Sequence, residues 1–155
     1  DLTFTLEQPC DTYEEIKSLK GRLNHPIFVD ESATDINMVC RSIQDGVADG
    51  FGMKITRVGG LSTMITIRDV CKHFNRPMSC DDSWGGDIIA AACVHMGATL
   101  APNLSEGVWI ADTYINGNYD AENPMSAGPQ IKVPTGPGLG IQPDSSKWTP
   151  VAAFD

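Results

Sequence analysis

The sequence lacks the features of several protein classes. Among its 155 residues, 20 acidic side chains outnumber 11 basic ones, which gives a formal net charge of -9. Because nucleic acids are bound by basic surfaces, this balance argues against nucleic acid as a partner. No apolar run approaches the roughly 20 residues that cross a bilayer, and the first residues lack the basic stretch and cleavage site of a signal peptide. We expect neither nucleic-acid nor membrane binding.

Paired cysteines are also missing. The chain has five cysteines, an odd number, and no Cys-x-x-Cys pair. Cys40, Cys71 and Cys93 fall on the apolar faces of predicted helices. This pattern is typical of reduced core cysteines rather than of a disulfide framework or a zinc site. We therefore expect a cytoplasmic protein.

Short apolar segments alternate with helical periodicity along the first two thirds of the chain. Thr12 and Glu15 form a capping-box pattern at the start of the first predicted helix. The strands are predicted at residues 2–6 and 26–29, at a segment ending near Lys54, at 77–80 and, as a fifth, at 99–102. The helices are predicted to start near residue 12 and to cover about 36–47, 61–74 and 88–96.

This alternation implies an α/β fold with a parallel sheet. Glu7, Asp30, Lys54 and Asp81 end successive strands about 25 residues apart, close to the roughly 30 residues of one unit of a (β/α)8 barrel. An open doubly wound sheet would give the same alternation, but polar residues at every strand end favour a barrel. A closed barrel needs about 250 residues, so we predict either a half-barrel that pairs with another chain or the C-terminal part of a longer TIM-like barrel. Residues 1–107 would form its βα units, and 108–155 a tail of loops with a lone strand at 131–133.

Glu7 and Asp30 would end adjacent strands, which lie about 4.8 Å apart in a sheet. Two carboxylates so close repel each other unless a cation lies between them, and Mg²⁺ prefers oxygen ligands. A cation beside Lys54, one strand further, would favour its neutral form and suit it to act as a base. The spacing is equally compatible with three helix caps and solvated strand ends.

Four motifs, in order and at the expected spacing, resemble those of the enolase superfamily, in its mandelate racemase/muconate lactonizing branch: Glu7-Gln8-Pro9, Asp30-Glu31-Ser32, residues 53–61 (MKITRVGGL) and residues 133–140 (VPTGPGLG). The resemblance covers nearly the whole chain. It implies that Glu7 and Asp30 are the second and third Mg²⁺ ligands, on barrel strands four and five. It also implies that Lys54 is the strand-six acid/base and that the tail returns toward a capping domain.

Residues 80–87 (CDDSWGGD) resemble 4-hydroxyproline betaine 2-epimerases and, less closely, cis-3-hydroxyproline dehydratases. Residues 49–54 and 119–123 also resemble the epimerases. A substrate ammonium needs a negative charge, which Asp81 or Asp82 would supply, and an aromatic face, which Trp84 would supply. Alternatively, Trp84 packs over the barrel mouth without touching a substrate.

The resemblance also implies parts that this sequence does not contain: the first metal-ligand aspartate, the strand-two lysine of the KxK motif and the capping segment. We expect Mg²⁺-dependent proton abstraction α to a carboxylate, in an epimerase or racemase of a proline-betaine-type amino acid. The alternatives are a cis-3-hydroxyproline dehydratase and an inactive binding or structural fragment.

A transfer of the α-proton from one face of the substrate to the other needs a base on each face. We therefore expect the N-terminal half of the barrel to be a separate chain or a missing segment. The open sheet edges of a half-barrel also lead us to expect a homo-oligomer.

Overall fold

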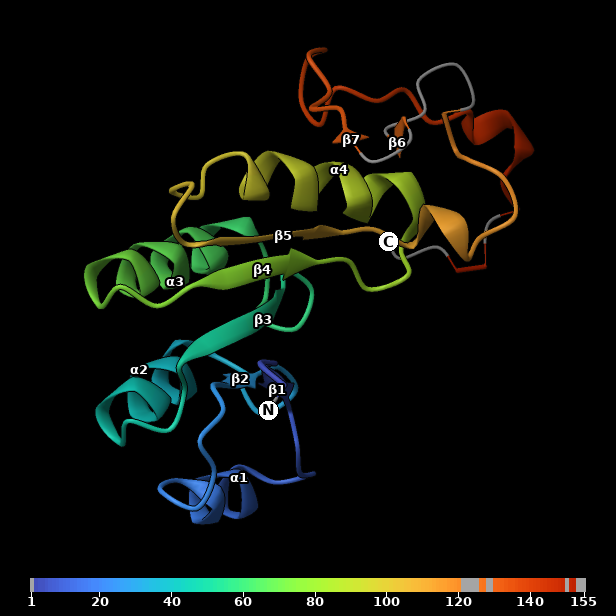
Figure 1. Cartoon of the computed structure of the whole chain (residues 1–155). Coiled ribbons are helices and arrows are strands. Elements are labelled where there is room, and N and C mark those ends of the chain that lie inside the picture. The colour runs from blue at the N-terminus through green and yellow to red at the C-terminus, as the bar shows by residue number, and fades with distance from the viewer. Residues whose placement is uncertain (1, 121–125, 128–129, 150, 153–155) are drawn as a thin grey trace.

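The computed structural model describes residues 2–120, 126–127, 130–149 and 151–152. Within these residues, five parallel strands form one sheet in the order β1-β2-β3-β4-β5, and a helix follows each of the first four strands (Figure 1). The strands are β1 (Leu6–Glu7), β2 (Ile27–Val29), β3 (Gly50–Lys54), β4 (Met78–Asp81) and β5 (Ser105–Trp109). The helices are α1 (Tyr13–Leu19), α2 (Ile36–Gln44), α3 (Leu61–His73) and α4 (Gly86–Gly97). The predicted alternation and parallel sheet are confirmed. In the described part of the chain, no helix has the length and apolar character needed to cross a membrane.

The first three helices begin within one residue of the predicted positions, and α4 begins two residues earlier than predicted. Thr12 caps α1: its hydroxyl accepts a hydrogen bond from the Glu15 backbone, and the Glu15 carboxylate accepts one from the Thr12 backbone at 3.0 Å. Asp35 caps α2 by accepting from the backbone N–H groups of Asn37 and Met38. These caps satisfy donors that the first turn of a helix leaves free.

The two faces of the sheet differ in kind. On the helix-covered face, the apolar side chains of β3 and β4 pack against the inner sides of the helices, and most are fully buried. This core includes Phe51, Met53, Cys80, Met64 and Ile67. The opposite face carries glycines and polar residues, together with aromatic rings such as that of Phe28, which lies against Gly50. Because side chains alternate along a strand, each βα unit contributes to both faces.

Two strand predictions were wrong. Leu2–Thr5 do not belong to β1, since β2 begins only at Ile27 and offers them no partner; Leu6 and Glu7 pair with Ile27 and Phe28. Residues 99–102 form no strand, because they close the end of α4: the Leu100 backbone N–H donates to Gly97. The fifth strand lies six residues later than predicted.

The tail packs against α4. The boundary expected between residues 107 and 108 falls within β5. Beyond it come the short 3-10 helix η1 (Ala111–Thr113), the antiparallel pair β6 (Ser126–Ala127) and β7 (Gln130–Ile131), and η2 (Ser145–Lys147). The lone strand predicted at 131–133 is thus shorter and paired. Leu139 and Ile141 pack on α4, and the backbone oxygen of Leu139 lies 3.0 Å from His95 Nε2. Figure 1 shows the tail running past α4. Of the 119–123 motif, residues 121–123 lie outside the described residues.

The five cysteines are free, as predicted. Cys71 and Cys93 are buried, but Cys40 is exposed, contrary to its expected place in the core. Residue 40 follows the buried Val39 on α2 and therefore points about 100° away from it around the helix.

Candidate metal and acid/base site

The predicted site residues lie at the carboxyl end of the parallel strands. Strand alternation directs positions 50, 52 and 54 of β3 to the face that the helices do not cover. A Cβ on Gly50 would collide with the Phe28 ring, and one on Gly52 would lie 2.9 Å from Glu7 Oε1. Glycine at position 52 therefore lets a carboxylate approach the backbone of β3 closely.

Three carboxylates converge there. Glu7, Asp30 and Asp81 each place an oxygen so that the three oxygens lie within 4.8 Å of one another. The sequence predicted Glu7 and Asp30 as neighbours, and the structure brings them together. It adds Asp81, which the sequence had assigned only to substrate binding. Next to this cluster, a cavity of about 480 Å³ is lined by Glu7, Asp30 and the loops that follow their strands.

Within this cluster, the pKa of the Asp81 carboxyl group is raised. Burial raises its pKa to about 6, and the negative charges of Asp30 and Glu7 act in the same direction. A hydrogen bond from Ser79 at 3.1 Å and the charge of Lys54 partly oppose the rise. Asp81 Oδ1 is buried and, among the described residues, has no hydrogen-bond donor. The carboxylate is therefore incompletely neutralised by the protein.

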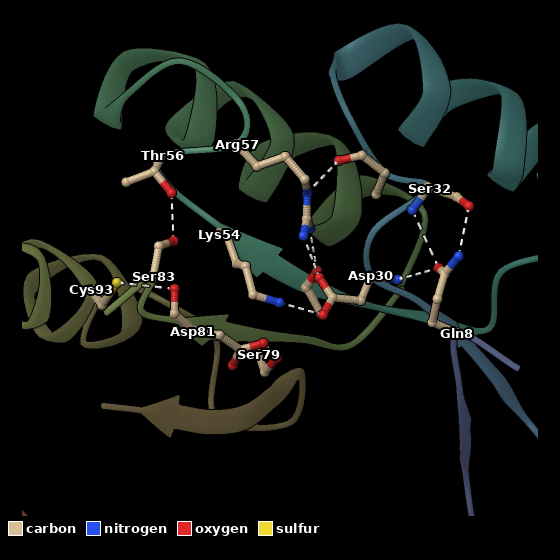
Figure 2. Close-up of polar contacts among 12 residues, drawn as sticks. Gln8, Asp30, Ser32, Lys54, Thr56, Arg57, Ser79, Asp81, Ser83 and Cys93 are labelled. Carbon is tan, nitrogen blue, oxygen red and sulfur yellow. Dashed lines mark hydrogen bonds and ion pairs between the residues drawn. The ribbon is translucent and has the colours of Figure 1, made fainter. Parts of the chain in front are cut away.

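Asp30 is the centre of an ion-pair network (Figure 2). It is 5% exposed, and its two oxygens contact Lys54 Nζ and Arg57 Nη1. Arg57 also donates to the backbone oxygens of Gly52, at 2.7 Å, and Ala33, at 3.1 Å. Arg57 therefore joins β3 to the loop after β2 and holds the Asp30 carboxylate in place. Sequence analysis assigned no role to Arg57; its position three residues after Lys54, before Gly59-Gly60, was the available signal.

Gln8 fixes the ends of β1 and β2 relative to each other. Its amide oxygen accepts from the backbone N–H groups of Asp30 and Ser32, and its amide nitrogen donates to the Ser32 hydroxyl at 2.8 Å (Figure 2). The side chain thus sets the backbone position from which the Asp30 carboxylate projects.

The three residues predicted to bind an ammonium group lie in different surroundings. Asp81 lies in the carboxylate cluster. Asp82 is buried, and its two oxygens accept from the backbone N–H groups of Trp84 and Ala111. Asp82 therefore ties together the loops after β4 and β5. Trp84 has a φ of 63° and is 67% exposed, with its ring 5.3 Å from that of Tyr114.

Trp109 is the aromatic residue that sequence analysis missed. It pairs in register with Asp81, at the end of β5. Val108 faces α4, where it would meet a Cβ on Gly97, so Trp109 points to the opposite face, the one that carries Asp81. With β5 misplaced at 99–102, no sequence signal could bring Trp109 to the site.

The donor set fits Mg²⁺. This ion binds carboxylate oxygens about 2.1 Å away and usually takes one or two carboxylates, with waters or substrate completing its coordination. Oxygens within 4.8 Å of one another can share such an ion. Each oxygen of Asp30 keeps acceptor capacity beyond its contact with Lys54 or Arg57. The residues that would hold the ion are Glu7 and Asp30, with Asp81 beside them.

The sequence is similar to those of known proteins. The family described as "Enolase C-terminal domain-like" matches residues 2–147. The chain is 33% identical over 142 residues to the cis-3-hydroxy-L-proline dehydratase of Roseibium aggregatum, covering 92% of this chain and 39% of that protein. It is 27% identical over 140 residues to an N-succinylamino acid racemase of an Amycolatopsis species, covering 89% and 38%.

Solved structures of the same family superpose on this chain. A mandelate racemase/muconate lactonizing enzyme from Roseovarius nubinhibens superposes with a TM-score of 0.90 at 31% identity, covering 98% of this chain and 42% of that one. Another from the same organism, described as putative and complexed with magnesium, gives 0.90 at 27% identity, covering 100% and 43%. The chain thus spans about two fifths of the length of the relatives it matches. It belongs to the enolase superfamily, in the mandelate racemase/muconate lactonizing enzyme family, and corresponds to the C-terminal part of that family's barrel.

Proposed function

We propose that this chain carries the acid/base lysine and two metal ligands of an enzyme that removes the proton α to the carboxylate of a proline-type amino acid. The observation that supports this most directly is the contact of Lys54 Nζ with Asp30 inside the cluster of three carboxylates. A base and a set of metal-binding oxygens on one face of a sheet are the two parts that such chemistry requires.

In the proposed step, Lys54 in its neutral form accepts the α-proton as the C–H bond breaks and becomes an ammonium that pairs with Asp30. The electron pair of that bond moves into the substrate carboxylate to form an enediolate. Mg²⁺ held by Glu7 and Asp30 would supply positive charge for that carboxylate. Asp30 and Arg57 fix the position of the lysine and its partner. Return of a proton to the other face of the α-carbon completes an epimerisation or racemisation. That proton must come from the protonated form of a second base, which lies outside this chain.

The site also supports recognition of an ammonium group. Asp81 offers a negative charge, and Trp109 lies beside it in register with an exposed ring. A quaternary ammonium is attracted both to a carboxylate and to an aromatic face. These neighbours favour a betaine-type substrate. Trp84 remains a second candidate for the aromatic contact.

Dehydration is the second candidate reaction, and the 33% identity to a cis-3-hydroxy-L-proline dehydratase favours it. The same enediolate would expel a β-hydroxyl group: the C–O bond breaks, a C=C bond forms, and the hydroxide leaves as water after protonation. Product analysis separates the two reactions, since epimerisation keeps the hydroxyl group and dehydration removes it.

We further propose that the barrel is completed by other strands. Within the described sheet, β1 and β5 each have a neighbour on one side only. Open edges tend to pair with another strand. The completing half and a capping domain would come from the rest of the protein or from another chain, and association into a homo-oligomer is compatible with either.

The experiment follows exchange of the α-proton for deuterium in D₂O with Mg²⁺, using the protein in its complete barrel. Lys54→Arg keeps a cation beside Asp30 but removes the base, because a guanidinium does not lose its proton. For the stereoisomer whose α-proton faces Lys54, we expect exchange to fall by about a thousandfold, whereas Lys132→Arg, on the exposed tail, leaves it unchanged. Exchange of both stereoisomers retained in Lys54→Arg would refute the assignment of the base.

Two aromatic variants test the ammonium contact. Trp109→Ala should weaken binding of a proline betaine by about fivefold or more, with a smaller effect on proline itself. Trp84→Ala is the matched comparison. Unchanged betaine affinity in Trp109→Ala would remove this residue from the site, and loss in Trp84→Ala alone would assign the contact to the loop after β4.

A further inference from the structure

A second cavity lies at the opposite end of the sheet from the carboxylate cluster. It has a volume of about 190 Å³ and is lined by the last turns of α3, the loop that follows, the start of β4 and the segment between α4 and β5. In Figure 1 this is the end away from the arrowheads of β4 and β5. Met78, the first residue of β4, lines this cavity, whereas Asp81, the last, belongs to the carboxylate cluster.

The cavity is positively charged in a chain whose net charge is -9. Three cations line it, Arg68, Lys72 and Arg76, against one carboxylate, Asp69. Asp69 is mostly exposed and pairs with Arg68 at 2.8 Å. No carboxylate among the described residues pairs with Lys72 or Arg76. The cavity therefore concentrates cations where the rest of the chain is acidic.

One of these cations has an unmet hydrogen-bonding requirement. Arg76 Nε is buried and has no acceptor among the described residues. A buried N–H without an acceptor is unfavourable, and a guanidinium matches the oxygens of a phosphate or carboxylate. Arg68 lines the same cavity, and its guanidinium is held in place: Nη1 donates to the Thr99 hydroxyl at 2.8 Å, and Nε and Nη2 contact Asp69 at 2.9 and 2.8 Å. Thr99 is in turn fixed by donating to the Met96 backbone oxygen.

The remaining lining limits the ligand to a small one. The walls include apolar side chains, among them Cys71, Met78 and Leu104. Burial raises the pKa of the Cys71 thiol to about 12, so this side chain adds no negative charge near neutral pH. The volume is below the roughly 300 Å³ at which pockets for drug-sized ligands begin. A single oxyanion fits these dimensions better than a nucleotide does.

We propose that this cavity binds a small divalent oxyanion of the phosphate class, held by Arg76 and Arg68 with Lys72 at the rim. The proposal is independent of the reaction assigned to the carboxylate cluster. The competing explanation is that the cations only complement the negative end of the α3 dipole. That explanation requires no ligand and predicts no phosphate binding.

The test is calorimetric titration of the full chain with sodium phosphate at constant ionic strength. We expect saturable binding to the wild-type chain and to Arg22→Gln, which removes the same charge from an exposed turn far from the cavity. Arg76→Gln should weaken binding by about tenfold or more. If Arg76→Gln does not fold, Lys72→Gln, at an exposed position, should weaken binding several-fold.

Three results would overturn the proposal: no saturable binding to the wild-type chain, equal binding by Arg22→Gln and the cavity variants, or acetate binding as tightly as phosphate. The last result would point to a carboxylate ligand rather than to a divalent oxyanion.

Discussion

Met53 and Lys54 are neighbours in β3, yet they belong to two different environments. Met53 is fully buried between the sheet and the helices. Lys54 lies on the other face, where it contacts Asp30 and is partly open to solvent. The helix-covered face is continuous apolar packing, whereas the other face combines glycines, carboxylates and cations. One face supplies the apolar packing and the other carries the proposed acid/base and metal-binding groups, so substitutions on the two faces should have separable effects.

The largest change in stability is expected on the helix-covered face. Met53→Ala removes a fully buried side chain and leaves a cavity, which should lower the free energy of unfolding by about 2–5 kcal/mol. Ile65→Ala, at an exposed position of α3, is the control and should change it by less than about 0.5 kcal/mol. Urea denaturation measures both. Equal losses would mean that the packing around Met53 contributes no more to stability than an exposed position of α3 does.

Gly52→Ala probes the opposite face without removing a functional group. The added Cβ would lie 2.9 Å from Glu7 Oε1 and 3.2 Å from Asp30 Cβ, which forces the two carboxylates to shift. Mg²⁺ affinity should fall by about tenfold to a hundredfold, measured by titration, while the urea midpoint changes little. Unchanged Mg²⁺ affinity would show that these carboxylates do not bind the ion together.

A smaller effect on stability is expected at the start of α1, away from the buried core and from the carboxylate cluster. Thr12→Ala removes the cap of α1 and should cost about 1 kcal/mol of unfolding free energy, with Mg²⁺ binding unchanged. Thr3→Ala, in an exposed segment before β1, provides the control. A change in Mg²⁺ affinity in Thr12→Ala would show that α1 influences the site and would weaken the separation drawn above.

The smallest effect is expected in the pH dependence of stability. Hydrogen bonds from Lys17 and Tyr13 lower the pKa of Asp45, which joins α1 to the end of α2. A carboxyl group whose pKa is lowered by folding stabilises the fold at pH values above its ordinary pKa. This contribution is lost as the pH falls through the pKa of the folded state. Acidification from neutral pH to about 3 should therefore destabilise the wild-type chain more than Asp45→Asn. Asp11→Asn, an exposed carboxylate, should follow the wild type; identical acid profiles for wild type and Asp45→Asn would contradict the linkage.

Sequence patterns correctly predicted the helices and strands that are specified by their own consecutive residues. The Thr12–Glu15 capping box, the buried strand ending at Lys54 and the helix after Gly60 are local features, and the structure confirms them. The strand at 99–102 failed because an apolar segment that closes a helix resembles a strand in sequence. Its true position depends on pairing with β4, which is a long-range contact.

The candidate site shows the same division. Glu7, Asp30 and Lys54 were identified from strand ends and motifs. The entry of Asp81 into the cluster, the bridging contacts of Arg57 and the place of Trp109 beside Asp81 depend on which strands are neighbours and on register. Asp82 shows the converse: adjacent to Asp81 in sequence, it accepts backbone hydrogen bonds from two loops.

The sequence by itself determined the α/β alternation, the family and the residue types available for chemistry, because periodicity, caps and motifs are properties of consecutive residues. Only the tertiary structure decided which carboxylates share one cluster and which cations pair with them. It also decided which cations at the other end of the sheet have no carboxylate partner among the described residues. The physical reason is that electrostatic interactions and hydrogen bonds depend on distance in space, and strands separated by about 25 residues of chain come within contact only when the sheet forms.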